Sequence, residues 1–539
     1  MGANASKEAI TGTITTTSST ARLNEKVPRP SAASPAMASL HHAADRLNRI
    51  EAEAQHALAA SEDKHPHPHP VSAEVTPAAV KEWSKAAWEL PTSRLASMVL
   101  HNADMAASLH SRAVEVADQH VFNVKIPDEG KPVVNQHSSG RCWLFALTNC
   151  IRIEVIKHLD LPEFELSQSY LHVWDKQEKS NYFLEQMIDL IEEPLESRIV
   201  SYLMQAPVND GGQFDMATNL VLKYGVVPKS VFPESFTSNA TGKFNSLLTY
   251  KLREYALELR DLRTQTLRRL DHTAASQAER DAVVLTTLRK RKDAQMREVY
   301  RMICIAYGEP PKPDEEFTWE YVDKKGKFHT MKTTPVQFQI EHTGTFTAKG
   351  SCSLVHDPRR EAGKLITVSR LGNIVGLNPV QYITSTPELM KAAAIRMLKA
   401  GVPVFCGSDF GHGVDSRSGI MDPRLIGYEL AFGIKLGMSK AERIKTGESA
   451  MTHATVLTGV HLDAKSGQPV RWRVENSWGE EVGDKGYMVM SDGWFDEWIF
   501  QVVIRKEYCR PQDWALFQRG VVPGETEALP PYDPFGALA

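Results

Sequence analysis

Long apolar runs are missing from this sequence, and cysteines are few. No stretch reaches the roughly 18 consecutive apolar residues that a membrane-spanning helix needs, and no apolar signal-peptide stretch opens the chain. We therefore expect neither a membrane span nor a signal peptide. The six cysteines include no Cys-x-x-Cys pair, which argues against a disulfide framework and against a cysteine-based zinc site. Reduced thiols in a cytosol-like compartment are the expectation.

A surplus of charge of one sign is also absent. The sequence has 62 Lys and Arg against 66 Asp and Glu, a net charge of −4, so its overall field gives no reason to expect nucleic-acid binding. A local basic run, Arg289–Lys292, stands among acidic residues in a strongly helical segment, 245–305. A solvated helix face is favoured there over a nucleic-acid or acidic partner. At 539 residues, the chain is expected to fold as two or three subdomains or one large elaborated domain.

The first 75 or so residues are rich in Ala, Ser, Thr, Pro and His, which predicts a disordered tail with one short helix over about 38–59. Its first six residues match the pattern for N-myristoylation on Gly2, which would give weak membrane contact. The alternative is a mitochondrial presequence, which Glu8 and Glu25 weaken. The alternating His and Pro residues at 65–70 favour an extended linker over a metal site. We predict no metal and no cofactor.

A polar loop at 135–141 runs into an apolar helical pattern that begins at Cys142. Apolar residues recur there at spacings of three and four: Leu144, Leu147, Ile151 and Val155. Free N–H groups and the positive dipole end at the first turn of a helix favour a thiolate. With a histidine to move its proton, Cys142 would be an acyl-transfer nucleophile. The side-chain amide of Gln136 and the Cys142 N–H are placed to form an oxyanion hole. A lone cysteine at a helix start is more often a small core residue, as we expect for Cys150.

His453 and Asn476 stand in two predicted strands, which a turn-rich segment separates. In a uniformly paired hairpin, opposed residues have position numbers with a constant sum, and pairing these two centres the turn between Ala464 and Lys465. We therefore predict cross-strand neighbours, with the amide accepting the imidazole N–H and fixing its tautomer. Trp478 is placed to cover that bond. Alone, each residue would be read as a buried histidine or a strand-end amide, but together with Cys142 they indicate catalysis.

Further elements follow from local patterns. Helices are predicted over 80–88, 91–116, 142–159 and from about 167, and a Gly-rich turn at 210–215 opens another. Buried strands are predicted at 402–406 and 454–460, within a region that is strand-rich from about 318. His412 lies in a Gly-rich turn without an obvious orienting partner.

These motifs resemble the papain-like cysteine proteases, and most of all their bleomycin hydrolase/aminopeptidase C branch, from about Pro91 to Ala539. The motifs that carry the resemblance are 135–149, 166–171, 210–215, 224–228, 451–454 and 475–479. The resemblance implies an α+β papain-like fold, with a helical domain and an antiparallel β-barrel domain. It also implies a catalytic domain over 76–509, a helical insertion at about 245–317, and a C-terminal arm over 510–539 that lies in the cleft.

The same resemblance implies the chemistry. Cys142 would be the nucleophile, His453 the general base and acid, Asn476 its orienting residue and Gln136 the oxyanion donor. The terminal carboxylate of Ala539 would receive the substrate's α-ammonium and select free N-termini. The expected protein is an intracellular cysteine aminopeptidase, cytoplasmic with a possible mitochondrial pool.

Its expected substrates are short peptides and amide or thiolactone analogues of amino acids, and its expected assembly is a homohexamer. His137 departs from the family, which usually has lysine at this position. The alternatives are an endopeptidase or acyltransferase on the same site, or a nucleic-acid-binding ring.

Overall fold

The computed structural model describes residues 74–272, 275–344 and 350–537. The N-terminal tail with Gly2, the His-Pro segment and Ala539 lie outside the described residues. The chain divides into two compact units, residues 1–97 and 98–539. Among the described residues, no helix combines the length and apolarity needed to cross a membrane. In the first unit, α2 (Pro77–Glu89) begins at Thr76, whose side chain accepts the N–H of Ala79, and no residue of α2 is buried.

The helical pattern predicted over 91–116 is divided among three helices: α3 (Pro91–Leu100), α4 (Met105–Ser108) and α5 (Arg112–Ala117). The side chain of Asn102 donates to the carbonyl of Met98, and Asp104 caps α4 by accepting the N–H of Ala107. These short polar side chains compete for backbone groups that a continuous helix would use, so the helix breaks between them.

The helical half of the second unit is built around α6 (Cys142–Leu159), which is buried along most of its length. It packs against α7 (Gln168–Asp189) and α9 (Phe214–Tyr224) on one side and against the sheet on the other. Ser167 caps α7 by accepting the N–H of Tyr170, as the sequence predicts. Two shorter helices, α8 (Arg198–Gln205) and α10 (Phe236–Asn239), lie beyond α7 in the chain.

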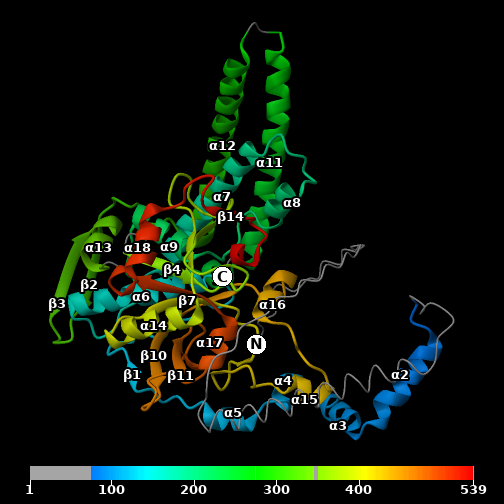
Figure 1. Cartoon of the computed structure of the whole chain (residues 1–539). Helices are drawn as coiled ribbons and strands as arrows, with labels where there is room; N and C mark the ends of the chain where they lie inside the picture. Colours follow the sequence, from blue (N-terminus) through cyan, green and yellow to red (C-terminus); the bar gives the residue numbers. More distant parts are fainter. Residues whose placement is uncertain (1–73, 273–274, 345–349, 538–539) are drawn as a thin grey trace. The chain divides into compact units, whose positions relative to one another are not determined.

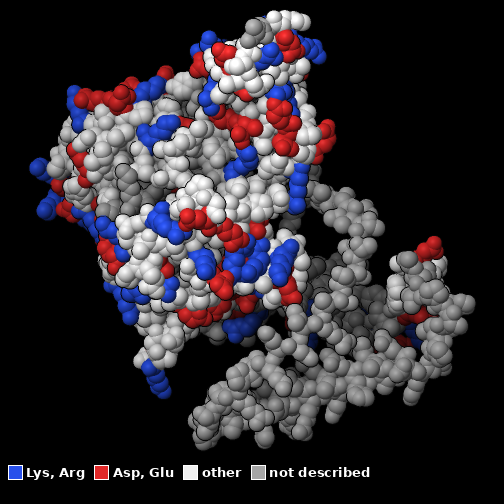
Figure 2. Space-filling view, turned by 45° about the horizontal axis from the view of Figure 1, so that its top comes forward, with Lys and Arg blue, Asp and Glu red and all other residues white. Residues whose placement is uncertain are grey.

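Two long helices follow, α11 (Gly242–Leu270) and α12 (Gln277–Tyr307), and they run side by side away from the body of this unit (Figure 1). The basic run on α12 is paired with acids: Arg289 with Glu185, Arg291 with Glu258, and Lys292 with Glu185. Figure 2 likewise shows basic and acidic side chains interspersed on the face that it presents. The helical pair leads to a hairpin of β2 (Phe317–Val322) and β3 (Phe328–Thr333), and to α13 (Pro335–His342).

The described residues also form a 12-stranded sheet, in the order β14-β5-β6-β4-β13-β7-β10-β11-β12-β9-β8, with β1 paired to β10. Its strands are β1 (Val124–Lys125), β4 (Ser351–Val355), β5 (Leu365–Val368), β6 (Gln381–Thr384), β7 (Val404–Ser408), β8 (Val414–Asp415), β9 (Ile420–Met421), β10 (His453–Leu462), β11 (Pro469–Glu475), β12 (Tyr487–Ser491), β13 (Ile499–Arg505) and β14 (Glu527–Leu529). The strands predicted at 402–406 and 454–460 correspond to β7 and β10. Figure 1 shows α6 and α14 beside these strands.

The remaining helices flank the sheet or lead into the C-terminal segment. They are α14 (Pro387–Lys399), α15 (Tyr428–Phe432), α16 (Lys440–Thr446), α17 (Asp492–Trp498) and α18 (Pro511–Arg519), with 3-10 turns η1 (Lys506–Tyr508) and η2 (Pro534–Gly536). The architecture is α+β, as expected.

The hairpin of β10 and β11 exists, but its expected register is wrong. Val456 pairs with Glu475 and Val460 pairs with Trp472, with irregularities after Leu457 and after His461. The pairs at the two ends of the ladder, Val456 with Glu475 and Leu462 with Pro469, have the same sum of position numbers, so the two irregularities cancel. The turn instead centres one residue later than expected, between Lys465 and Ser466, and is closed by the N–H of Asp463, which donates to the carbonyl of Gln468. The ladder with β11 ends at Val456 and Glu475, so His453 and Asn476 lie beyond it and are not paired in it. On the other edge of β10, His453 pairs with Ser408 of β7.

Candidate active site

Cys142 is the first residue of α6, and its side chain is buried, with 2% of the residue exposed. The N–H of a first helical residue has no intrahelical acceptor, so it remains available to a ligand. Burial raises the pKa of the Cys142 thiol to about 11, while N–H groups of Ala454, Trp143 and Cys142 itself act to lower it. The N–H groups thus favour the predicted thiolate, but the effect of burial on the pKa is larger, so the neutral thiol is favoured. The Ala454 N–H also places the thiol beside the residue that follows His453.

His453 begins β10 and is held by an amide. Its Nε2 and the Oδ1 of Asn476 are 2.9 Å apart, so Nε2–H donates and Nδ1 is left for proton exchange. Asn476 reaches the ring because it lies just past the end of β11, outside the shifted ladder. Its Oδ1 also accepts the N–H of Ser477, which fixes the amide. Burial lowers the pKa of His453 to about 4, against the effect of its hydrogen bond to Asn476, so the resting imidazole is neutral.

Aromatic rings close over the imidazole. The ring of Trp478 lies 5.1 Å from that of His453, centroid to centroid, which is the covering position predicted for it. Phe410 packs edge-on against the imidazole at 4.7 Å and against Trp478 at 5.1 Å. The sequence gives no signal for Phe410, because the Gly-rich turn that contains it shows no periodicity. His412 itself stacks on Trp498 and pairs with Asp409.

Gln136 is brought to the site by backbone pairing. The N–H of Gln136 donates to the carbonyl of Ser477 at 2.8 Å, and the N–H of Gly479 donates to that of Val134 at 3.0 Å. The side chain of Gln136 is held at both ends: Nε2 donates to the carbonyl of Ser139 at 2.6 Å, and Oε1 accepts the Ser477 hydroxyl at 2.6 Å. One hydrogen of the Nε2 amide remains for an oxyanion.

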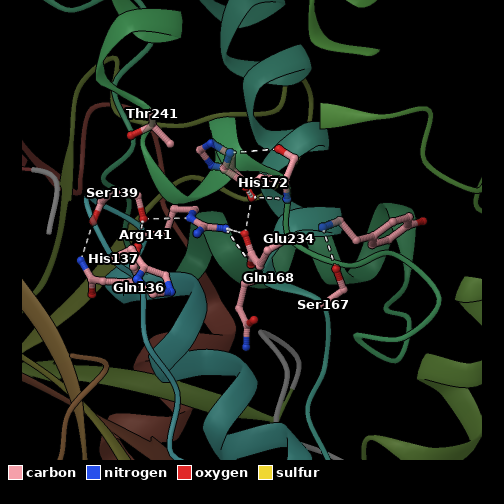
Figure 3. Close-up of polar contacts among 12 residues, drawn as sticks. Gln136, His137, Ser139, Arg141, Ser167, Gln168, His172, Glu234 and Thr241 are labelled. Carbon is pink, nitrogen blue, oxygen red and sulfur yellow. Dashed lines mark hydrogen bonds and ion pairs between the residues drawn. The ribbon is translucent and has the colours of Figure 1, made fainter. Parts of the chain in front are cut away.

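A buried ion pair supports the loop 135–141. Arg141, which is fully buried, donates twice from Nη1 to the carboxylate of Glu234, at 2.9 and 3.0 Å. Its Nε donates to the hydroxyl of Ser139 at 2.9 Å, and that hydroxyl donates to the carbonyl of Gln136. Figure 3 shows Arg141 between Ser139 and Glu234. The hydroxyl of Ser238 adds a further bond to Glu234. No periodicity in the sequence points to Glu234, which lies 93 residues from its partner.

Asp210 ties the same loop to α7 and α11. Its carboxylate accepts the N–H of Gly140 at 3.2 Å and bonds the ammonium of Lys176 at 2.7 Å. Thr241 and Asn245, from the start of α11, also donate to it. Burial alone would raise the pKa of Asp210, but Lys176 and the hydrogen bonds hold it well below its ordinary value. The Asp210 carboxylate is therefore an ionised anchor behind the loop that leads to Cys142.

The Gly-rich turn after Asp210 covers the residue that follows the thiol. The indole N–H of Trp143 donates to the carbonyl of Asp210 at 2.6 Å. A Cβ on Gly212 would stand 2.6 Å from the Trp143 ring, so only glycine is accommodated there without movement. Gln213, next in the chain, donates from Nε2 to the carbonyl of Ala537 at 2.5 Å. The C-terminal segment therefore reaches the loop that packs on Trp143.

A second buried pair joins α6 to β11. Arg152 of α6 donates to the carboxylate of Glu475 at 2.5 Å, and Asn149 donates to the same oxygen at 2.9 Å. Burial raises the pKa of Glu475 to about 7, against the pull of Arg152. This contact holds the helix that carries Cys142 against the strand that precedes Asn476.

The comparisons with known proteins agree with this geometry. The family model of the peptidase C1-like family matches residues 74–536. The chain belongs to the peptidase C1-like family. It is 40% identical to cysteine proteinase 1, mitochondrial, of Saccharomyces cerevisiae over 473 residues, 87% of this chain and 94% of that protein. It is 42% identical to mouse bleomycin hydrolase over 436 residues, 79% of this chain and 90% of that protein.

Among solved structures, PepW from Lactobacillus rhamnosis aligns with a TM-score of 0.79 and 37% identity, over 87% of this chain and all of that one. The fold is thus papain-like, and the protein is a cysteine-type peptidase of the bleomycin hydrolase type. Among the described residues, no cluster of three or more His, Cys, Asp or Glu is arranged to hold a metal ion.

The structure brings together four of the five predicted site residues: Cys142, Gln136, His453 and Asn476. His137 is exposed beside them, in a left-handed conformation with φ 52°, and its N–H donates to the side chain of Asn135. The reasoning from sequence missed Arg141, Glu234 and Ser477, which hold Gln136. Ser477 lies inside the predicted motif 475–479, so its contact with Gln136 could have been predicted from the sequence. Glu234 lies in no such motif.

Proposed function

We propose that this peptidase removes N-terminal residues from short peptides through a thioester on Cys142. The observation that carries the proposal is the hydrogen bond from Gln213 to the carbonyl of Ala537, which supports a C-terminal arm ending in the substrate cleft. Two further residues, outside the described part, separate Ala537 from the terminal carboxylate of Ala539. A carboxylate fixed at the cleft would pair with a free α-ammonium and would block longer chains from passing it.

The arm is anchored along its described part, which supports a fixed position. The carboxylate of Asp533 accepts from Arg359 at 2.9 Å, and the ring of Phe535 is fully buried against Tyr382 and Phe500. Arg198 lies 3.7 Å above the ring of Tyr532. A rigid arm loses little entropy on binding substrate, so its terminal charge can select among substrates effectively.

In the proposed reaction, the Cys142 sulfur attacks the carbonyl of the first residue while Nδ1 of His453 takes the thiol proton. Asn476 holds the imidazole in the tautomer that can accept it. The oxyanion receives the N–H of Cys142 and the second amide hydrogen of Gln136, which the Ser139 and Ser477 contacts hold in place. His453 then protonates the leaving amine, and the thioester is hydrolysed by water that the same imidazole deprotonates.

Because burial favours the neutral forms of both groups, the charge separation occurs as the substrate reacts. The low-dielectric surroundings provided by Phe410 and Trp478 strengthen the oxyanion contacts at that moment. Substrates are proposed to include amide and thiolactone analogues of amino acids, since the same acyl chemistry serves both. We also propose a cytoplasmic or mitochondrial location. The proposed assembly is a homohexamer, and light scattering of the full chain would test it.

The experiment compares rates on an aminoacyl fluorogenic amide and on its N-acetylated form. Deleting Leu538 and Ala539 withdraws the terminal carboxylate by about 7 Å. We expect the preference for the free amine to fall about 10- to 100-fold, the worth of one charge-assisted hydrogen bond. The matched control Ala539→Gly keeps the carboxylate and is expected to keep the preference. An unchanged preference after the deletion would rule out the arm's role. Efficient cleavage of the N-acetylated form by the intact chain would instead indicate an endopeptidase.

A further inference from the structure

Two cysteines outside the active site meet where the C-terminal arm begins. Cys352 lies in β4, and Cys509 follows η1, one residue before the segment 510–539. Both thiols are free, and their Sγ atoms are 2.9 Å apart. The chain between them spans 157 positions. The contact therefore joins distant parts of the sequence and is not a local coincidence of neighbouring residues.

Two separate features of the fold place the pair. The first is the pairing of β13 with β4, which sets Ile504 directly opposite Cys352. The second is the turn after β13, in which the N–H of Cys509 donates to the carbonyls of Arg505 and Lys506, both at 3.2 Å. This turn folds Cys509 back so that its thiol donates to the carbonyl of Ile504 at 3.5 Å. The strand register and the turn thus aim the two sulfur atoms at one another.

The two thiols differ in access. Cys352 is buried, with 1% of the residue exposed, whereas Cys509 is partly exposed. A small reagent can therefore reach Cys509 first, and Cys352 is already in place to complete an exchange. Burial and the neighbouring sulfur both favour the neutral thiol at Cys352, and the neighbouring sulfur is the larger cause of its raised pKa.

We propose that Cys352 and Cys509 form a dithiol site that a small-molecule disulfide, such as glutathione disulfide, oxidises to an internal disulfide. The Cys509 thiolate attacks one sulfur of the reagent and expels one glutathione thiolate, which leaves a mixed disulfide. The Cys352 thiolate then attacks the Cys509 sulfur and expels the second glutathione. Two protein thiols are oxidised, one glutathione disulfide is reduced to two thiols, and the two protons pass to the released glutathione.

The new bond would tie β4 to the root of the arm. Just beyond Cys509, α18 begins, and Arg510 pairs with the buried Asp513 in its first turn. Closing so long a loop restricts the unfolded chain, so the oxidised protein is expected to melt at a higher temperature than the reduced one. Cys352 and Cys509 lie outside the proposed catalytic set, so the dithiol site does not depend on the proposed function.

The test incubates the reduced full-length protein in glutathione buffers of rising disulfide fraction, blocks free thiols in acid, and maps peptides by mass spectrometry. We expect a cross-linked peptide joining 352 to 509, with mixed glutathione adducts at these two positions at least about tenfold rarer, because the second thiol is pre-positioned. Cys304, a half-buried thiol on α12 beside Tyr300, is the internal control and should give a mixed adduct only. Repeating the assay with Cys142→Ala should leave the result unchanged.

A stable mixed adduct at Cys509, or full alkylation of both thiols at every glutathione ratio, would overturn the proposal. The thermal measurement adds a second criterion, with Cys352→Ser and Cys509→Ser as paired variants. The oxidised wild-type chain should melt above the reduced chain, and both variants should lose that difference. Equal melting temperatures in the oxidised and reduced wild type would disprove a stabilising disulfide between Cys352 and Cys509. The peptide map uses the wild-type chain, so its result does not depend on whether a variant folds.

Discussion

Replacing Glu234 by glutamine tests the support of the loop 135–141, which carries Gln136, the proposed oxyanion donor. The wild-type carboxylate accepts two hydrogen bonds from the buried Arg141 guanidinium, whose Nε reaches Ser139 and, through it, the carbonyl of Gln136. Glutamine retains the size and one acceptor oxygen but leaves the buried guanidinium charge without its counter-charge. Breaking a buried pair in this way costs about 3–5 kcal/mol of stability, and the retained hydrogen bond places the expected loss near the lower end.

The effect on catalysis should be smaller than removal of the donor itself. Loss of an entire oxyanion donor lowers kcat about 100- to 1000-fold. In Glu234→Gln, the backbone pairing of Gln136 with Ser477 and the Ser477 hydroxyl still hold the amide. We therefore expect kcat to fall about tenfold, which corresponds to roughly 1.4 kcal/mol of transition-state stabilisation, with KM changed little.

The assay separates positioning from general damage. Inhibition by an aminoacyl aldehyde, whose adduct carries an oxyanion, should weaken in parallel with kcat, whereas alkylation of Cys142 by a neutral chloroacetamide should keep its rate. Glu258→Gln is the matched control, because Glu258 pairs with Arg291 on an exposed helix face and such pairs contribute only about 0–1 kcal/mol. Equal loss of aldehyde binding and of alkylation in Glu234→Gln would refute the reasoning, as would an effect no larger than that of the control.

Three further outcomes follow from the same contacts. Gln136→Ala should lower kcat about 100- to 1000-fold at nearly constant KM in steady-state assays, and a change in KM alone would contradict its assignment as oxyanion donor. Because burial lowers the pKa of His453 to about 4, kcat/KM should fall on the acid side through an apparent pKa near 4, where the imidazole gains a proton and can no longer accept one; a limb near 6.5 would mean a solvated ring. Burial raises the pKa of Glu475 from 4.5 to about 7, so its contribution to stability is complete below 4.5 and is lost as pH rises to about 7. Glu475→Gln should flatten that part of the denaturation profile, and an unchanged slope would show that Glu475 does not titrate there.

The sequence predicted those parts of the site that local patterns determine. The helix that starts at Cys142 and the cap of α7 at Ser167 follow from apolar spacing and capping chemistry, and both lie where expected. The partnership of His453 with Asn476 was also predictable, although for an incomplete reason. The turn between β10 and β11 centres one residue later than expected, and the hydrogen bond forms because Asn476 lies beyond the end of β11. The turn-forming residues 463–467 do not fix the centre of the turn to one position, so this offset could not be read from them.

Long-range polar contacts were beyond the reach of the sequence. Glu234 and Asp210 support the loop before Cys142 from positions 93 and 70 residues away from their partners, and only folding brings them together. The contact of Cys352 with Cys509 is of the same kind. Breaks caused by competing side chains, as at Asn102 and Asp104, were in principle visible but were outweighed by the apolar period around them.

The most direct test of the account is the rate of Cys142→Ala on an aminoacyl fluorogenic amide, measured against the wild type and against Cys150→Ala. Cys150 is a buried thiol on the same helix, so the control removes an equivalent sulfur atom from the core. If Cys142 is the nucleophile, its alanine variant should lose at least about 10⁴-fold in kcat/KM while Cys150→Ala remains active. Amide hydrolysis by folded Cys142→Ala at a rate comparable to that of Cys150→Ala would contradict the account.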